Sequence, residues 1–325
     1  MRIVIAVNDP PIWVLPAAEV GRIRSSLPAE EVVEAPTADE RRQLFATADV
    51  LLTTWVSEEE AELFGRLRWI HSTAVGVGGL LRRGVVSRQV TITNSRGVHA
   101  EPIAEHALAL ALSLRRRLHV ARARQLEGVW AQEELYGQRA VGLAGSCLLV
   151  VGLGAIGSRV AAMARGLGMR VIGVRARTDL PAPAAVDHVY PPQRLTAALS
   201  LADVVVLAAP HTRGTRAMIG RAELSAMLPS AVLVNVARGA LVDEGALVEA
   251  LEAGRIAGAG LDAFSREPLP AESPLWRLPN VLITPHTASF QGDYWPPAVD
   301  LFLDNMRRFA RGEPLVNIVD PGRGY

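Results

Sequence analysis

The chain contains no lysine, and only one of its 325 residues is a cysteine. All 34 basic side chains are therefore arginines, which excludes a Schiff-base lysine and the lysine of a phosphate-binding P-loop. The single Cys147 cannot form an internal disulfide, and its apolar neighbours in SCLLVV predict a buried structural thiol. Because such low cysteine use is typical of a reducing compartment, we expect a cytoplasmic protein.

Charge imbalance and long apolar runs are also absent. The formal net charge is only +1, so the composition does not favour nucleic acid as a partner. No apolar run approaches the roughly 20 residues that span a bilayer, and no signal-peptide pattern follows MRIVIAVND, so we expect no membrane association. No spacing of histidine, cysteine, aspartate and glutamate indicates a metal site.

Short apolar runs alternate with amphipathic stretches along most of the chain. Four runs lie in about the first 95 residues (RIVIAV, ADVLLTTW, LRWIHSTAV and VTITN), which predicts a small parallel α/β unit. Six more begin at about Gly145 (SCLLVVGLG, MRVIGVRA, ADVVVLAAP, AVLVNVARG, IAGAGLDAF and NVLITPH), as a doubly wound parallel sheet requires. The length also favours two domains over one.

Two further segments have helical periodicity. The segment from about Ala100 to Gln125 is long and apolar, which predicts either an internal core helix or a subunit interface. The segment DYWPPAVDLFLDNMRRFARGEPLVN, near residue 300, predicts a helix with a polar, arginine-bearing face.

A glycine-rich turn lies between the strand CLLVV and the helix that follows it. Gly152, Gly154 and Gly157 form the pattern G-x-G-x-x-G, which allows a tight turn, close approach of a pyrophosphate and close helix–strand packing. The first helical amides, those of Ala155 and Ile156, would face the phosphates at the positive end of the helix dipole. We therefore predict a dinucleotide site.

The end of the next strand indicates which dinucleotide binds. The strand MRVIGV is followed by Arg175, Arg177 and Thr178, where an NAD-specific protein usually has an acidic residue. Arginine can pair bidentately with a 2′-phosphate, so we predict NADP(H) as the preferred cofactor. NAD(H) remains possible, because the arginines could be solvated and Asp179 could reach a ribose hydroxyl.

Three charged residues downstream of this turn match the chemistry of a small 2-oxo acid. A guanidinium such as that of Arg238 can engage the carboxylate and the carbonyl of the substrate together. Histidine suits proton transfer near neutral pH, so we assign His286 as the general acid in reduction and the base in oxidation. Glu267 would stabilise and orient its imidazolium.

The ordered motifs resemble the D-isomer-specific 2-hydroxyacid dehydrogenase family. They are HSTAVGVGGL (71–80), NSRGVHAEPIAEHALAL (94–110), VVGLGAIGSRV (150–160), LAAPHTRGT (207–215), LVNVARGALVDEGAL (233–247), GAGLDAFSREPLP (258–270) and NVLITPHTAS (280–289). The resemblance places the catalytic triad on Arg238, Glu267 and His286, and the amides that hold the substrate carboxylate on Val75 and Gly76. It implies cofactor contacts from Pro210, Thr215, Val236 and Asp262, with the Asp262 carboxylate on the nicotinamide carboxamide.

The resemblance also implies an architecture and an activity. We expect two Rossmann-like domains with a cleft between them: residues 1–97 with 291–325 for the substrate, and residues 98–290 for the dinucleotide. We expect a homodimer through the helix near residues 100–125. The expected activity is NADPH-dependent reduction of glyoxylate or hydroxypyruvate to a D-2-hydroxy acid. Two alternatives stay open, a reductase of a bulkier 2-oxo acid with Trp55, Tyr294 or Trp295 in its pocket, and a dinucleotide-sensing corepressor.

Overall fold

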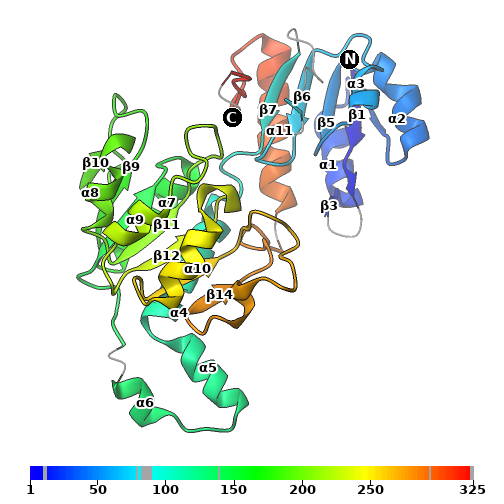
Figure 1. Cartoon of the computed structure of the whole chain (residues 1–325). Coiled ribbons are helices and arrows are strands. Elements are labelled where there is room, and N and C mark those ends of the chain that lie inside the picture. The colour runs from blue at the N-terminus through cyan, green and yellow to red at the C-terminus, as the bar shows by residue number, and fades with distance from the viewer. Residues whose placement is uncertain (10–12, 78–79, 82–89, 138–139, 293, 323–325) are drawn as a thin grey trace. The chain divides into compact units, whose positions relative to one another are not determined.

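The protein consists of two compact units (Figure 1). The structure, a computed structural model, describes residues 1–9, 13–77, 80–81, 90–137, 140–292 and 294–322. Unit 1 comprises Met1–His99 and Gln291–Tyr325, and unit 2 comprises Ala100–Phe290. Each unit is built around a sheet in which every pairing is parallel, so the prediction of two parallel-sheet α/β domains is confirmed.

Unit 1 contains a five-stranded sheet with the order β4-β1-β5-β6-β7. Its strands are β1 (Arg2–Ala6), β4 (Glu31–Glu34), β5 (Val50–Thr53), β6 (Trp69–Ser72) and β7 (Thr91–Asn94). The helices α1 (Ala17–Ser26) and α11 (Trp295–Arg311) bury their apolar sides on one face, and α2 (Ala38–Leu44) and η1 (Phe45–Thr47) lie towards the other. The short pieces are β2 (Asn8–Asp9), β3 (Trp13–Val14) and α3 (Glu58–Ala61).

Unit 2 contains a seven-stranded sheet with the order β10-β9-β8-β11-β12-β13-β14. The strands are β8 (Cys147–Val151), β9 (Arg170–Val174), β10 (His188–Tyr190), β11 (Val204–Leu207), β12 (Val232–Asn235), β13 (Gly258–Leu261) and β14 (Val281–Ile283). The order reverses at β8, which is the arrangement of a doubly wound dinucleotide-binding sheet. Cys147 begins β8 and is buried with a free thiol, as its apolar neighbours predict.

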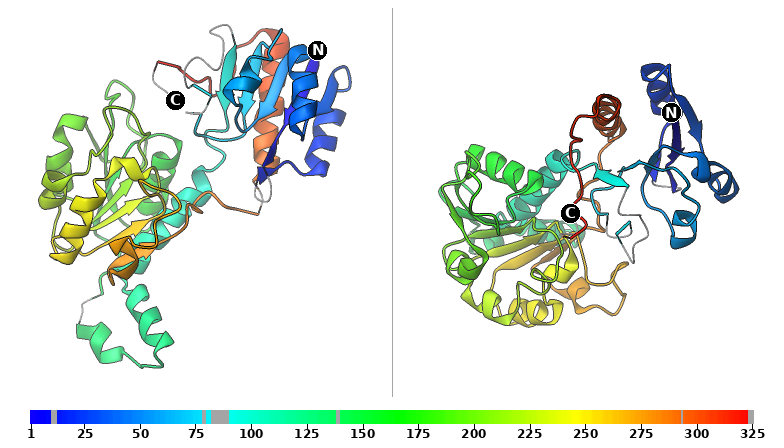
Figure 2. Two further views of the ribbon diagram at one scale, coloured as in Figure 1. Left: turned by 45° about the vertical axis from the view of Figure 1, so that its right-hand side comes forward. Right: turned by 90° about the horizontal axis from the view of Figure 1, so that it is seen from above.

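Helices cover both faces of the unit 2 sheet (Figure 2). The helices α4 (Ala100–Arg115) and α7 (Ala155–Gly166) pack on one face, and α8 (Leu195–Leu199), α9 (Arg221–Ala226) and α10 (Glu244–Glu252) pack on the other. The described residues of this unit also form the 3-10 turns η3 (Pro192–Arg194), η4 (Gly239–Leu241) and η5 (Pro274–Arg277). Within the described part of the chain, no helix is long and apolar enough to cross a membrane.

Two edge strands, β4 and β10, are not predicted from the sequence. They are short, and each lies at the edge of its sheet with a charged or polar composition, EVVE and HVY. Neither strand contains a fully buried residue, and each lacks the continuous apolar run that marks a central parallel strand. The parallel pairing with β1 or β9 that makes these segments strands is visible only in the folded sheet.

The prediction of a single helix near residues 100–125 is wrong, because the structure has two helices there. The segment forms two helices, α4 and α5 (Leu118–Leu126), because Arg117 adopts a left-handed backbone conformation with φ of 58° between them. Helix α4 buries eight residues in the core of unit 2, whereas neither α5 nor the following α6 (Gln132–Gly137) contains a buried residue. Figure 1 shows α5 and α6 extending away from the sheet of their own unit.

Acid is expected to destabilise unit 1 through His71, which is fully buried on β6. Burial lowers the pKa of His71 to about 3 from its ordinary value of 6.5. The unfolded chain therefore binds a proton here below about pH 6.5, while the folded chain does not until about pH 3, so stability falls as pH decreases across this window. Between pH 7 and pH 5 we expect this group to remove about 2 kcal/mol from the free energy of unfolding.

Urea unfolding of the wild type and of His71→Gln at both pH values measures this contribution. The loss of stability on acidification should be smaller in the variant by that amount. Equal losses in the two proteins would contradict the prediction, because the remaining titratable groups are common to both.

Candidate active site

The candidate catalytic residues follow three neighbouring strands of unit 2. Strands β12, β13 and β14 lie side by side and run parallel, so their carboxyl ends meet at one edge of the sheet. Arg238 follows β12, Glu267 lies in the loop after β13, and His286 follows β14. Ligands of open α/β sheets bind at this carboxyl edge, so the topology gathers the three loops where chemistry is expected.

His286 and Glu267 are in direct contact. The Nδ1 atom of His286 lies 2.7 Å from Oε2 of Glu267, and the backbone amide of Phe264 donates to the other carboxylate oxygen, Oε1, at 2.9 Å. With Nδ1 turned towards the carboxylate, Nε2 is the ring nitrogen left for a substrate. The side chains are 44% and 37% exposed, so the pair is open to a small molecule.

Arg238 is exposed and lies at the start of η4 in an extended backbone conformation. Its guanidinium donates to the carbonyl oxygen of Ala237 at 2.7 Å, and its own carbonyl oxygen accepts from the Asn235 side chain at 3.0 Å. The next residue, Gly239, packs so tightly that a Cβ atom there would lie 1.9 Å from the carbonyl carbon of Phe264. The arginine loop is thereby held against the segment that leads to Glu267.

Asp262 is the first residue after β13, and it is only 2% exposed. Its Oδ1 atom accepts from the Thr284 hydroxyl at 2.6 Å and from the Thr287 amide at 2.8 Å, and its Oδ2 atom accepts from the Ala288 amide at 3.0 Å. The carboxylate assigned to the nicotinamide by resemblance therefore also anchors the loop that bears His286.

The glycine turn after β8 has the geometry that a pyrophosphate requires. Gly152 has a φ of 101°, and a Cβ atom on it would lie 2.6 Å from the Ala209 backbone. A Cβ atom on Gly157 would lie 1.9 Å from the Gly152 carbonyl oxygen, whereas one on Gly154 would meet nothing within 4 Å. Gly154 precedes the twelve-residue helix α7, and no side chain caps its first amides, which include those of Ala155 and Ile156. The open backbone at this helix start fits a phosphate group.

The loop after β9, which bears Arg175 and Arg177, begins beside this turn, because the Gly152 amide donates to the Val174 carbonyl oxygen at 2.8 Å. The Arg175 guanidinium donates to the carbonyl oxygens of Leu180 and Pro181, and its Nε atom is buried without a partner. Arg177 pairs with Asp179 at 3.3 Å and lowers the pKa of that carboxyl, and the Thr178 amide bonds the Ala176 carbonyl oxygen. Two guanidiniums and one carboxylate therefore lie where the ribose end of a dinucleotide would be expected.

The remaining residues assigned to the cofactor lie after β11 and β12. The Thr215 hydroxyl donates to the Pro210 carbonyl oxygen at 2.7 Å and accepts from the Thr212 amide at 2.8 Å, so the loop after β11 is internally braced. Val236 is buried directly after β12. All of these loops leave the same edge of the unit 2 sheet as the glycine turn.

Val75 and Gly76 belong to unit 1, in the loop after β6. The Asn94 side chain donates to the Val75 carbonyl oxygen at 2.8 Å, and Gly76 is exposed. Thr73, at the start of this loop, accepts a hydrogen bond on its carbonyl oxygen from the Tyr294 hydroxyl and one on its side chain from Trp13 Nε1, the latter at 3.0 Å. Tyr294 is buried, and its burial raises the pKa of its hydroxyl.

The aromatic residues considered for a larger pocket therefore differ in their surroundings. Tyr294 donates a hydrogen bond to the loop after β6, and Trp295 packs against Trp13 with ring centroids 5.3 Å apart. Trp55 is 48% exposed, so it is the one of these three with a large free surface within unit 1.

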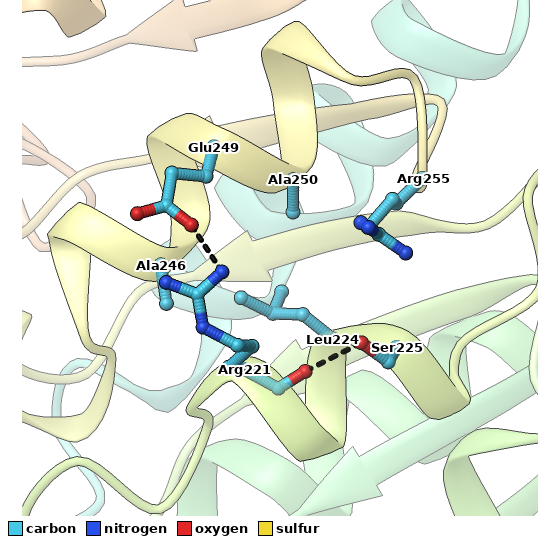
Figure 3. Close-up of a pocket in the computed structure, with 7 residues that line it drawn as sticks. All are labelled: Arg221, Leu224, Ser225, Ala246, Glu249, Ala250 and Arg255. Carbon is cyan, nitrogen blue, oxygen red and sulfur yellow. Dashed lines mark hydrogen bonds and ion pairs between the residues drawn. The ribbon is translucent and has the colours of Figure 1, made fainter.

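Unit 2 also has a shallow pocket that is lined by other residues than those at the carboxyl edge of its sheet (Figure 3). It lies between α9 and α10, where Arg221 forms an ion pair with Glu249 and lowers the pKa of that carboxyl. None of the candidate site residues lines it, so we give it no role in the chemistry.

Two residues to which the sequence assigns no function, Thr284 and His106, join the network around Asp262. Thr284 lies two residues before His286, and His106 lies on α4, nearly 180 residues earlier, with its Nε2 atom 2.9 Å from the Thr284 hydroxyl oxygen. His106 has the helical spacing of a packing residue, so nothing in its local pattern marks it. Across the described ranges there is no cluster of three or more potential metal ligands.

Comparison with known proteins identifies relatives over most of the chain. Residues 108–288 match the family model of the D-isomer specific 2-hydroxyacid dehydrogenase NAD binding domain. A glyoxylate reductase of Korarchaeum cryptofilum is 36% identical over 275 residues, which are 83% of this chain and 81% of the relative.

Two solved structures share the whole architecture. A D-isomer specific 2-hydroxyacid dehydrogenase family protein from Aeromonas salmonicida is 32% identical with a TM-score of 0.83, over 98% of this chain and 99% of the other. A D-isomer specific 2-hydroxyacid dehydrogenase from Xanthobacter autotrophicus, solved in complex with NADPH and MES, is 28% identical with a TM-score of 0.85, over 100% of this chain and 99% of the other.

Proposed function

Because the chain belongs to the D-isomer specific 2-hydroxyacid dehydrogenase family, we propose that it reduces small 2-oxo acids, such as glyoxylate or hydroxypyruvate, with NADPH. Its activity as a 2-hydroxyacid dehydrogenase, and hence as an oxidoreductase, follows from the family. The observation that carries the proposed mechanism is the 2.7 Å contact between His286 and Glu267 at the carboxyl edge of the sheet. The choice of a small acid rests on relatives named glyoxylate reductase.

The proposed roles follow from the chemistry of the reduction. A nicotinamide held by unit 2 would supply hydride to the carbonyl carbon of the substrate, whose oxygen would then need a proton. His286 donates a proton from Nε2 to this oxygen, while Glu267 accepts from Nδ1 and stabilises the imidazolium. Arg238 binds the substrate carboxylate and polarises the carbonyl. By the resemblance, we assign the amides of Val75 and Gly76 to the substrate carboxylate.

The dinucleotide would be held by unit 2. We assign its pyrophosphate to the amides of Gly154, Ala155 and Ile156, because Gly152 and Gly157 allow the tight turn and the space beside Gly154 is open. The nicotinamide carboxamide would bind Asp262, whose Oδ2 accepts one hydrogen bond in the structure and has a second lone pair to offer. Pro210, Thr215 and Val236 would line the path between these two ends.

The experiment that tests this function is a substrate panel. Oxidation of NADPH and of NADH is followed by absorbance with glyoxylate, hydroxypyruvate, pyruvate, phenylpyruvate and branched 2-oxo acids. Fast turnover of glyoxylate or hydroxypyruvate with NADPH is the expected result. Turnover of phenylpyruvate alone would replace the proposal with a bulkier substrate, and dinucleotide binding without any turnover would favour a sensing role.

The cofactor preference depends on Arg175. Replacing it with alanine is expected to lower kcat/KM for NADPH at least tenfold, because one charge-assisted hydrogen bond to the 2′-phosphate contributes about 1.5–3 kcal/mol. The value for NADH should change little, because NADH lacks that phosphate. Arg194→Ala, which removes an exposed arginine from η3 of the same unit, is the matched control. A parallel loss with both cofactors would contradict the assignment.

We further propose that α5 and α6 contact a second copy of the chain. Trp130 and Tyr136 are both 89% exposed and Leu126 is 72% exposed, which is unusual for large apolar side chains on an isolated protein. Trp130→Ser is expected to convert a dimer into a 34.8 kDa monomer in light scattering after size-exclusion chromatography. Trp276→Ser, which removes an exposed tryptophan from η5, should leave the dimer intact. A monomeric wild type would refute the proposal.

A further inference from the structure

The backbone of His286 adopts a conformation that histidine seldom takes. Its φ is 55°, in the left-handed region, where a non-glycine residue costs about 1–3 kcal/mol unless its surroundings hold it. The His286 amide bonds back to the Thr284 carbonyl oxygen at 3.0 Å. The ring direction depends on this backbone, so whatever holds the loop also aims the proton donor.

Asp262 holds the loop on both sides of His286. Its carboxylate accepts from the Thr284 hydroxyl before the histidine, and from the amides of Thr287 and Ala288 after it. Three hydrogen bonds to one buried carboxylate, which has almost no solvent to replace them, tie the flanking residues to the end of β13.

The direction of these hydrogen bonds determines which ring nitrogen of His106 carries a hydrogen. A carboxylate only accepts, so the Thr284 hydroxyl must give its hydrogen to Asp262. The hydroxyl oxygen of Thr284 is then the acceptor in its 2.9 Å contact with His106, and His106 must carry a hydrogen on Nε2. His106 Nε2 is farther from Asp262 itself, 3.7 Å from Oδ1, so the threonine hydroxyl joins the two.

We propose that His106 and Thr284 are positioning residues that act through Asp262 to hold His286 in its left-handed conformation. The inference rests on the proposed function, in which His286 transfers the proton. Donation from His106 keeps the Thr284 hydroxyl pointing at Asp262, and the carboxylate then keeps the flanking backbone in place. Helix α4, a core helix of unit 2, is thus connected to the catalytic loop by one chain of hydrogen bonds.

Paired substitutions test this proposal. Thr284→Val keeps the shape but lacks the hydroxyl, and Thr284→Ser keeps the hydroxyl. His106→Leu removes the donor, and His106→Gln offers an amide donor near the position of Nε2. The valine and leucine variants are expected to lower kcat at least tenfold with little change in KM, because a small misplacement of the proton donor slows chemistry more than binding. The serine and glutamine variants should retain most of the wild-type kcat.

A second measurement separates this inference from the proposed function. In protein labelled with ¹³C at the histidine ring, the Cε1 resonance of His286 is assigned by its loss in His286→Asn. It is expected to move in Thr284→Val and His106→Leu, and to stay near its wild-type position in the serine and glutamine variants. This readout holds even if the wild type reduces no 2-oxo acid, in which case only the proposed function fails. An unmoved resonance in both the valine and leucine variants would overturn the inference.

Discussion

Replacing His286 with asparagine is expected to lower kcat for 2-oxo acid reduction by about 10²–10⁴-fold, which is the usual contribution of general acid catalysis. The asparagine side chain cannot transfer a proton near neutral pH, so the alkoxide would have to take its proton from water. Asparagine also tolerates a left-handed backbone, so the φ of 55° at this position should be kept. The loss should therefore report chemistry rather than misfolding.

Binding and turnover must be measured together in this experiment. NADPH affinity, followed by cofactor fluorescence, is expected to stay near the wild-type value, because the glycine turn is assigned to the phosphates and His286 is not. His188→Asn is the matched control, since it removes an exposed histidine from the edge strand β10 of the same unit. Turnover within a few-fold of wild type in His286→Asn would refute the assignment of the proton donor.

Replacing Arg238 with lysine is expected to lower kcat/KM for the 2-oxo acid by about a hundredfold. A planar guanidinium can donate two parallel hydrogen bonds to a carboxylate, whereas an ammonium presents a compact charge without that geometry. The loss of one charged hydrogen bond is worth about 1.5–3 kcal/mol, and each 1.36 kcal/mol is a factor of ten in rate. The substitution keeps the positive charge of the side chain, so a loss of activity would report the lost bidentate geometry.

The surroundings of Arg238 hold its backbone in place, so wild type and Arg238→Lys should differ in this side chain alone. Its backbone is held by the Asn235 side chain, and Gly239 packs against Phe264, so the loop should keep its course when only the side chain changes. Arg277→Lys, at an exposed arginine of η5, controls for the general effect of introducing a lysine into this lysine-free chain. Steady-state kinetics with saturating NADPH gives kcat/KM for the wild type and for each variant. Equal kcat/KM for wild type and Arg238→Lys would exclude a bidentate role.

The architecture could be anticipated because central parallel strands leave a strong local signal. Runs such as CLLVV and VLVN are buried on both faces, so their composition alone distinguishes them from loops. Where a strand lacks an apolar run or the backbone is unusual, the local signal fails. The strands EVVE and HVY are examples of the first case, and the helix break at Arg117 is an example of the second.

The two-unit α/β architecture, the glycine turn and the family can be read from the sequence, because apolar runs, glycine spacing and the order of motifs are visible along the chain. The contact of Glu267 with His286 Nδ1, the anchoring of the histidine loop by Asp262 and the contact of His106 on α4 with Thr284 are visible only in the folded protein. These contacts join residues between 19 and 178 positions apart. Parallel pairing of β13 with β14 brings the loops of Asp262, Glu267 and His286 together, and the packing of α4 on the sheet brings His106 to Thr284.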